Sequence, residues 1–120
     1  MTTVFVYGTL KRGWDLAHLL DGQDYLGLAQ TRPCYRMATL EDGAYPGLYT
    51  PGDGSGVQVT GELWSVSDTC LAELDRVEGV DQGYYQRSPI ELLPPHDRFR
   101  AQAYFYLKSI NGCPDAGDCW

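Results

Sequence analysis

The sequence predicts an α+β fold, a small mixed and mostly antiparallel β-barrel flanked by short helices. Residues 57–66 alternate apolar and polar side chains, which is the period-two pattern of a half-buried strand. Residues 67–77 instead carry apolar side chains at helical spacing. Further short apolar stretches are bounded by Gly and Pro, as is typical of successive strands in a small sheet. The 120 residues suffice for one hydrophobic core, so we expect a single domain over 1–120.

The first half of the chain is expected to be mostly extended. Its elements are a strand at 3–7, a short helix at 14–20, an extended stretch at 24–40, a turn at 41–43 and a short strand at 45–49. Gly13 separates the first turn from the helix. Pro33 interrupts the extended stretch, because proline lacks the N–H that a strand ladder needs. Residues 51–56 are rich in glycine, and this flexible loop serves either as a lid or as a connector.

The second half begins with the alternating strand and one clear helix. Its elements are a strand at 57–66, a helix ending near Val77, and strands at 84–93 and 98–107 joined by a Pro-Pro turn that includes His96. Ser67 is suited to cap the helix, and Asp68 complements the helix dipole in the first turn. The polar segment 108–120 is expected to be a loose tail, with Trp120 as the residue that could dock.

The turn after the first strand is the first candidate binding element. It reads Tyr7-Gly8-Thr9-Leu10 and follows the apolar run Val4-Phe5-Val6. Gly8 can take a positive φ, which would bring backbone N–H groups close to a ligand. Successive amides that converge in such a turn form a small anion-binding nest. The basic pair Lys11-Arg12 fits either solvated residues on the turn or a contact with an anionic ligand.

Glu78 is the candidate general base. It follows the amphipathic helix and precedes a glycine, so its side chain can project into a cavity. Helical spacing carries Glu78 toward the side of Leu71 and Leu74, which sets it apart from Glu73 and Asp75. The low polarity of a cavity would raise the pKa of this carboxyl toward the range where it accepts and returns protons.

Together these two segments closely resemble the gamma-glutamylcyclotransferase-like family, which also carries the AIG2-like name. The turn Tyr7-Gly8-Thr9-Leu10 with Lys11-Arg12-Gly13 matches the YGTLKRG branch, and the acidic segment reads L-D-x-V-E-G followed by G-Y-Y-Q-R. Further likenesses are Tyr45-Pro46-Gly47, the strand Val59–Trp64 with its G-E-L-W, and Tyr104-Phe105-Tyr106. The resemblance covers nearly the whole chain up to about residue 107.

The resemblance implies an enzyme that needs no metal or other cofactor. Members cyclise a gamma-glutamyl amine or amide to 5-oxoproline and release the free amine. Glu78 matches the single acid that moves the protons, while Tyr7, Gly8, Thr9 and Leu10 match the substrate-binding turn. Tyr85 matches a tyrosine beside the acid, and Tyr84 is the alternative because a register shift of one residue exchanges the two faces.

Other functions are disfavoured. The net charge of −7, from 16 acidic and 9 basic residues, argues against nucleic acid and anionic membranes as partners. The four cysteines show none of the spacings of zinc or redox sites. No nucleotide-binding glycine motif is present. A glycosidase pair of Glu78 with Glu73 or Glu62 conflicts with the helical phase. We expect a cytoplasmic protein, since no signal peptide or membrane-spanning stretch is seen.

Two questions stay open at this level. The YGTLKRG form is more similar to the branch that acts on gamma-glutamyl amines than to the glutathione-degrading branch, but the amine itself is not specified. The competing hypothesis is a non-catalytic ligand-binding or interaction module on the same scaffold. Arg87 fits either a pocket residue or a salt bridge on the face of the sheet. Tyr106 fits either a pocket residue or an aromatic residue of the core. The oligomeric state is not indicated.

Overall fold

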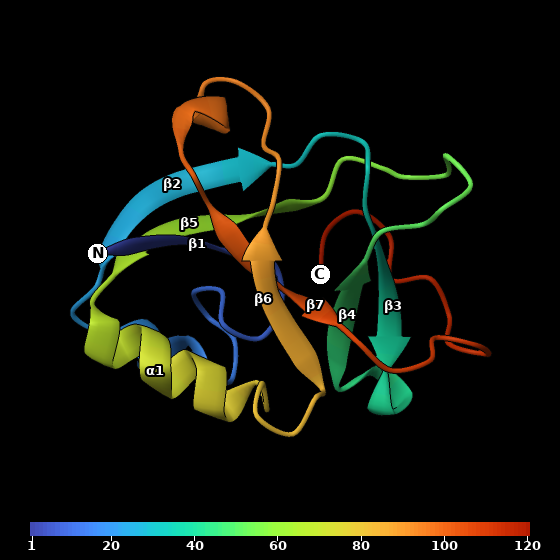
Figure 1. Ribbon diagram of the computed structural model, residues 1–120, viewed down its shortest axis with the longest axis horizontal. Coiled ribbons are helices and arrows are strands. Elements are labelled where there is room, and N and C mark those ends of the chain that lie inside the picture. Colours follow the sequence, from blue (N-terminus) through green and yellow to red (C-terminus); the bar gives the residue numbers. More distant parts are fainter.

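Seven strands form one curled sheet, with a single α-helix against one face (Figure 1). The computed structural model describes all 120 residues apart from the side chain of Asp42. The strands are β1 (Thr2–Val6), β2 (Asp24–Gln30), β3 (Arg36–Leu40), β4 (Tyr45–Tyr49), β5 (Thr60–Val66), β6 (Tyr85–Pro89) and β7 (Gln102–Tyr106). The α-helix is α1 (Asp68–Val77), and the three 3-10 helices are η1 (Ala17–Leu20), η2 (Glu41–Gly43) and η3 (His96–Arg98).

The sheet is mixed and mostly antiparallel, as predicted. Its order is β2-β5-β1-β7-β4-β3, and β6 pairs with β7 outside this path. Only the β1–β7 and β4–β7 pairs are parallel among the strand pairs described. The sheet does not close through its end strands, but an isolated bridge between Thr31 and Leu92 joins the chain beyond β6 to the end of β2. The arrangement is therefore an open, barrel-like sheet.

β1 and β4 share one edge of β7 and separate there. β6 pairs with all of β7, from Tyr85 opposite Tyr106 to Pro89 opposite Gln102. On the other edge, β1 meets only the start of β7, and β4 meets only its end. The Tyr7 hydroxyl lies between the two, because it donates to the Tyr104 carbonyl at 2.6 Å and accepts from the Leu48 amide at 3.2 Å. This fork opens space beside the end of β1.

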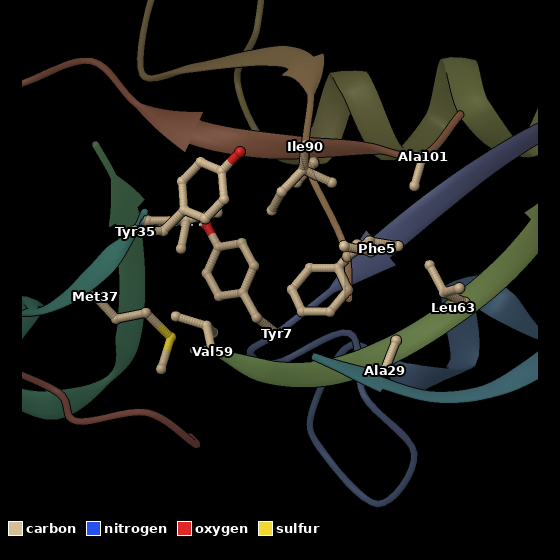
Figure 2. Packing of buried hydrophobic residues seen from close by; sticks show 12 residues of the cluster. Phe5, Tyr7, Ala29, Tyr35, Met37, Val59, Leu63, Ile90 and Ala101 are labelled. Atoms are coloured by element: carbon tan, nitrogen blue, oxygen red, sulfur yellow. Dashed lines mark hydrogen bonds between the residues drawn. The ribbon is translucent and has the colours of Figure 1, made fainter. Parts of the chain in front are cut away.

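The alternation of side chains along β1 divides the core into two clusters. Phe5 and Tyr7 point into the curl of the sheet, where they pack with residues such as Met37 and Leu63 (Figure 2). Val4 and Val6 point to the opposite face, as a strand's two-residue period requires. That second face packs against α1 through Leu74 and its neighbours, so the helix is held on the sheet by burial of its apolar side.

Helix α1 has the predicted boundaries and cap. The Ser67 hydroxyl accepts a hydrogen bond from the Cys70 amide at 3.1 Å, which satisfies one of the free donors at the helix start. Glu78 is the C-cap residue, and Gly79 follows with φ 71°. A left-handed glycine at this position ends the helix and redirects the chain, so Glu78 is fixed at the last turn.

The helix expected at 14–20 is replaced by successive turns, and only Ala17–Leu20 forms a 3-10 helix. The Leu16 amide donates to the Thr9 carbonyl at 2.9 Å, so the chain folds back on the preceding turn. Trp14, at the start of this segment, is 43% exposed. The long-range closure of the turn therefore outweighs the local apolar spacing.

The C-terminal tail is anchored, where a loose segment was expected. The Thr39 amide donates to the Pro114 carbonyl at 2.7 Å, and the Ala116 amide donates to the Met37 carbonyl at 2.8 Å. These bonds satisfy the outer edge of β3, which otherwise has no partner strand. The chain ends with Trp120, whose ring lies 6.2 Å from that of Trp14 between centroids.

All four cysteines are free thiols. Within the described part of the chain, no helix is both long and apolar enough to cross a membrane.

Candidate active site

A cavity of about 460 Å³ lies beside the fork in the sheet. The turn after β1, the end of α1, the start of β4 and the tyrosines of β6 and β7 contribute to its wall. All six residues predicted for the site line this cavity, namely Tyr7, Gly8, Thr9, Leu10, Glu78 and Tyr85. The structure thus brings together two segments about 70 residues apart in the sequence.

Glu78 places a carboxylate on the wall of this cavity. Its amide donates to the Leu74 carbonyl at 2.9 Å, which continues the helix by one residue. Its side chain forms no hydrogen bond or ion pair with any residue that the structure describes. Burial raises the pKa of the Glu78 carboxyl from 4.5 to about 7. Near neutral pH this group can therefore both accept and release a proton.

Asp75, one helical turn earlier, has the opposite environment. The Arg87 guanidinium donates to both of its oxygens, at 2.9 Å and 3.1 Å, and the Tyr104 hydroxyl donates to it at 2.7 Å. These bonds tie the end of α1 to β6 and β7, so they fix the position from which Glu78 projects. Two carboxylates at the end of one helix thus have different environments, because Asp75 is paired and Glu78 lines the cavity. Arg87 thus forms a salt bridge with Asp75, which was one of the two sequence-based interpretations of this residue.

The turn after β1 is shaped by close packing. A Cβ atom on Gly8 would lie 2.7 Å and 2.8 Å from Cγ and Cδ of Pro46. Gly8 does not use the positive φ that glycine allows, and the contact with Pro46 is the reason that only glycine fits. The Lys11 amide closes the turn on the Gly8 carbonyl at 3.0 Å. The amides of Thr9 and Leu10 donate to no other described residue, which leaves both N–H groups free for a ligand.

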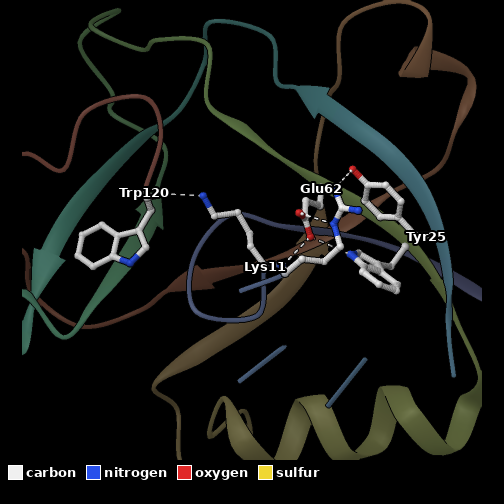
Figure 3. Close-up of polar contacts among 6 residues, drawn as sticks. Lys11, Tyr25, Glu62 and Trp120 are labelled. Atoms are coloured by element: carbon white, nitrogen blue, oxygen red, sulfur yellow. Dashed lines mark hydrogen bonds and ion pairs between the residues drawn. The ribbon is translucent and has the colours of Figure 1, made fainter. Parts of the chain in front are cut away.

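Glu62 holds the far side of this turn (Figure 3). It is only 5% exposed, and it accepts hydrogen bonds from the Arg12 amide at 3.1 Å, the Arg12 Nε at 3.2 Å and the Trp64 indole at 3.2 Å. The Arg12 guanidinium also lies 3.9 Å from the ring centroid of Tyr25. Glu62 does not line the cavity, so it serves the turn and not a pair with Glu78.

The basic pair of the turn is used within the fold. Lys11 is buried and donates from Nζ to the main-chain oxygen of Trp120 at 2.7 Å (Figure 3). Arg12 is paired with Glu62, so neither of the two sequence-based interpretations describes these residues fully. The signal that was missed is the acid inside the strand Val59–Trp64, because a glutamate among buried residues requires a partner.

Several tyrosines surround Glu78. The Tyr85 hydroxyl donates to the Pro46 carbonyl at 3.1 Å, and Tyr84 also lines the cavity although it is 52% exposed. Burial first, and the charge of Glu78 second, raise the pKa of the Tyr85 phenol well above its usual range. Burial and hydrogen bonding to Asp75 raise that of Tyr104, with a smaller contribution from Glu78. These phenols stay protonated at neutral pH and can act as hydrogen-bond donors.

The model of the family described as "Gamma-glutamyl cyclotransferase, AIG2-like" matches residues 4–120. The chain belongs to this family. A Vibrio cholerae protein provisionally named gamma-glutamylcyclotransferase is 42% identical over 115 residues, covering 96% of this chain and 92% of that protein. Gamma-glutamylaminecyclotransferase A of Danio rerio is 37% identical over 94 residues, covering 74% of this chain and 57% of that protein. An Arabidopsis thaliana relative, also provisionally named gamma-glutamylcyclotransferase, is 39% identical, and the match spans 51% of its length.

Solved structures agree with membership in the gamma-glutamyl cyclotransferase, AIG2-like family. An AIG2-like protein from Mus musculus superposes with a TM-score of 0.77 at 29% identity, covering 98% of this chain and 87% of that chain. A uropathogenic E. coli-specific protein superposes with a TM-score of 0.80 over the whole of this chain and 94% of that chain, and at 23% identity this likeness concerns the fold alone.

Proposed function

We propose that this protein cyclises a gamma-glutamyl amine or amide to 5-oxoproline and releases the free amine, with Glu78 as the general acid and base. The observation that carries the proposal is the unpaired Glu78 carboxyl, with a pKa near 7, on the same cavity as the free amides of Thr9 and Leu10. The family and the names of the relatives support the same class of reaction.

In the first step, Glu78 removes a proton from the alpha-ammonium group of the glutamyl substrate. The freed amine nitrogen attacks the gamma-carbonyl carbon, so a C–N bond forms, the ring closes and negative charge develops on the carbonyl oxygen. Because nucleophile and electrophile belong to one molecule, the protein's task is to hold the glutamyl chain folded. The Thr9 and Leu10 amides are suited to stabilise the oxyanion or to bind the alpha-carboxylate.

In the second step, the bond to the leaving amine breaks. Glu78 returns its proton to the departing nitrogen, and the electron pair of the tetrahedral oxyanion restores the carbonyl of 5-oxoproline. The ring nitrogen still carries a second proton of the former ammonium group, and Glu78 takes it up and passes it to the released amine, which leaves as an ammonium ion. One carboxyl thus performs all the transfers and ends in its starting state. This sequence consumes no water and uses no cofactor. The neutral phenol of Tyr85 lies on the same cavity, where it can donate a hydrogen bond to substrate if it leaves Pro46.

The test compares Glu78→Gln with Glu73→Gln on a panel of gamma-glutamyl amines, with 5-oxoproline measured by mass spectrometry. Glu73 belongs to the same helix but is bonded to Arg76, so it serves as the matched control. Glu78→Gln should lower kcat by a factor of about 10² to 10⁴, while Glu73→Gln should keep wild-type turnover. Full activity of Glu78→Gln would refute the role of Glu78. Substrate binding without turnover by the wild type would instead favour a non-catalytic binding module.

A further inference from the structure

The same cavity has a second group of side chains, at the hairpin between β3 and β4 and the facing ends of β6 and β7. Glu41, Tyr45, Tyr84 and Tyr106 line the cavity there. In the register of the hairpin, Tyr45 lies opposite Leu40, the residue that precedes Glu41. The Leu107 amide donates to the Tyr84 carbonyl at 3.0 Å, which brings Tyr84 beside the end of β7. The proposed reaction at the turn amides and Glu78 assigns no role to these four side chains.

Glu41 is held in an unusual backbone conformation. Its φ is 48°, and it is the only non-glycine residue with positive φ in the described chain. Residues without glycine's freedom seldom adopt this region, and such outliers occur preferentially at functional sites. The Ala44 amide fixes the turn by donating to the carbonyls of Leu40 and Glu41, both at 3.1 Å. The Glu41 carboxylate has no ion pair with another described residue.

The charge of Glu41 acts on the neighbouring phenols. Burial first, and the negative charge of Glu41 second, raise the pKa of Tyr45. Glu41 also contributes to the raised pKa of Tyr106, after burial and Cys113. The acid and the aromatic rings therefore share one region of the cavity.

A carboxylate beside aromatic faces is a site for a cation. The protein itself provides an example, because the exposed Lys108 ammonium lies 5.5 Å from the ring centroid of Tyr84. Arg76 is the other basic residue near this region, and its guanidinium is engaged with Glu73. A basic group on a substrate would thus meet the Glu41 carboxylate, which has no ion pair with a described residue, and the tyrosine rings, with Lys108 as a competitor that is free to move into solvent.

We propose that Glu41 and the rings of Tyr84 and Tyr106 form a subsite for a positively charged group on the leaving amine. The favoured substrates are then gamma-glutamyl derivatives of diamines, or of other amines with a second cationic centre. This inference rests on the proposed function, because it assigns the part of the cavity that receives the leaving group.

The test uses three substrates with the same four-methylene spacer, which differ only in the group at the far end of the leaving amine. These are the gamma-glutamyl derivatives of diaminobutane, pentylamine and aminopentanoate, which end in a cation, a methyl group and an anion. The wild type should favour the diaminobutane derivative over the pentylamine derivative by about tenfold in kcat/KM. The aminopentanoate derivative should be the poorest.

Three variants locate the preference. Glu41→Gln should reduce the cation-to-methyl ratio to within about twofold. Lys108→Met should raise the ratio, because it removes the competing ammonium from the Tyr84 face. Glu91→Gln makes the same change of net charge on an exposed residue that does not line the cavity, and it should keep the wild-type ratio. An equal ratio in wild type and Glu41→Gln, or a wild-type preference for the methyl or anionic end, would overturn the inference.

Calorimetric binding of the same three compounds to Glu78→Gln separates this inference from the proposed reaction. The cationic compound should have the lowest dissociation constant of the three, and this difference should disappear in the double variant with Glu41→Gln. That result supports the subsite even if the wild type converts no compound to 5-oxoproline. If the wild type converts all three compounds and Glu78→Gln binds them with equal dissociation constants, the proposed reaction is supported and the subsite is refuted. The two hypotheses therefore fail in different measurements.

Discussion

Replacing Glu78 by Gln should stabilise the folded protein at about pH 8 and leave its stability almost unchanged at about pH 4. Burial raises the pKa of this carboxyl from 4.5 to about 7 in the folded state. Between these two values the folded protein holds a proton that the unfolded chain has released, so the free energy of unfolding falls as the pH rises. Above pH 7 the full cost of the buried charge is present, and it amounts to about 3 kcal/mol.

Glutamine has nearly the shape of the protonated acid but cannot ionise, so the variant avoids this cost. Urea denaturation at several pH values should show a gain of about 3 kcal/mol at pH 8 that disappears toward pH 4. Glu73→Gln is the control, because the hydrogen bond from Arg76 lowers the pKa of Glu73 and its ionised form is favoured. That variant should gain nothing at pH 8. If Glu78→Gln were no more stable than the wild type at pH 8, the carboxyl would not be desolvated in the cavity.

Three further predictions concern the rate and the turn. As the pH is lowered below about 7, wild-type kcat/KM should fall about tenfold per pH unit, because Glu78 becomes protonated. A fall that begins only near pH 4.5 would contradict the raised pKa of Glu78. Gly8→Ala should cost about 1–3 kcal/mol in urea denaturation, because its Cβ would overlap the Pro46 ring, whereas Gly52→Ala has open space and should be neutral. Glu62→Gln should lower the free energy of unfolding by about 1–2 kcal/mol and raise KM, because it alters a buried acceptor of three hydrogen bonds. An unchanged KM would show that the turn does not depend on Glu62.

Signals that act over a few residues could be predicted from the sequence. Ser67 caps α1 through the amide three residues later, so its role depends only on local chemistry. The phase of the same helix placed Glu78 on the packed side, and the residue does line the cavity. Its role in catalysis stays a prediction.

Contacts between distant segments could not be predicted from local patterns, and a common site for the turn and Glu78 was expected only from the family resemblance. Gly8 is required by Pro46, and Glu62 binds Arg12 across 50 positions, so no local pattern reveals either partner. The tail was expected to be loose because it is polar and rich in turn residues, yet its backbone groups satisfy the edge of β3. Burial of Lys11 depends on Trp120, the last residue of the sequence. In each case the decisive neighbour is brought by the sheet topology.

The fork at β7 has a consequence for how specificity can change. The wall that holds the turn amides belongs to β1, and the wall that carries Glu41, Tyr45 and Pro46 belongs to the β3–β4 hairpin. The two walls branch from one strand and are joined there by the Tyr7 hydroxyl. Pro46 of the hairpin also packs against Gly8 and accepts the hydrogen bond of Tyr85, so it must be kept. Mutant libraries confined to Glu41 and Tyr45 could therefore change the wall of the pocket at the hairpin while the turn and Glu78 keep their geometry.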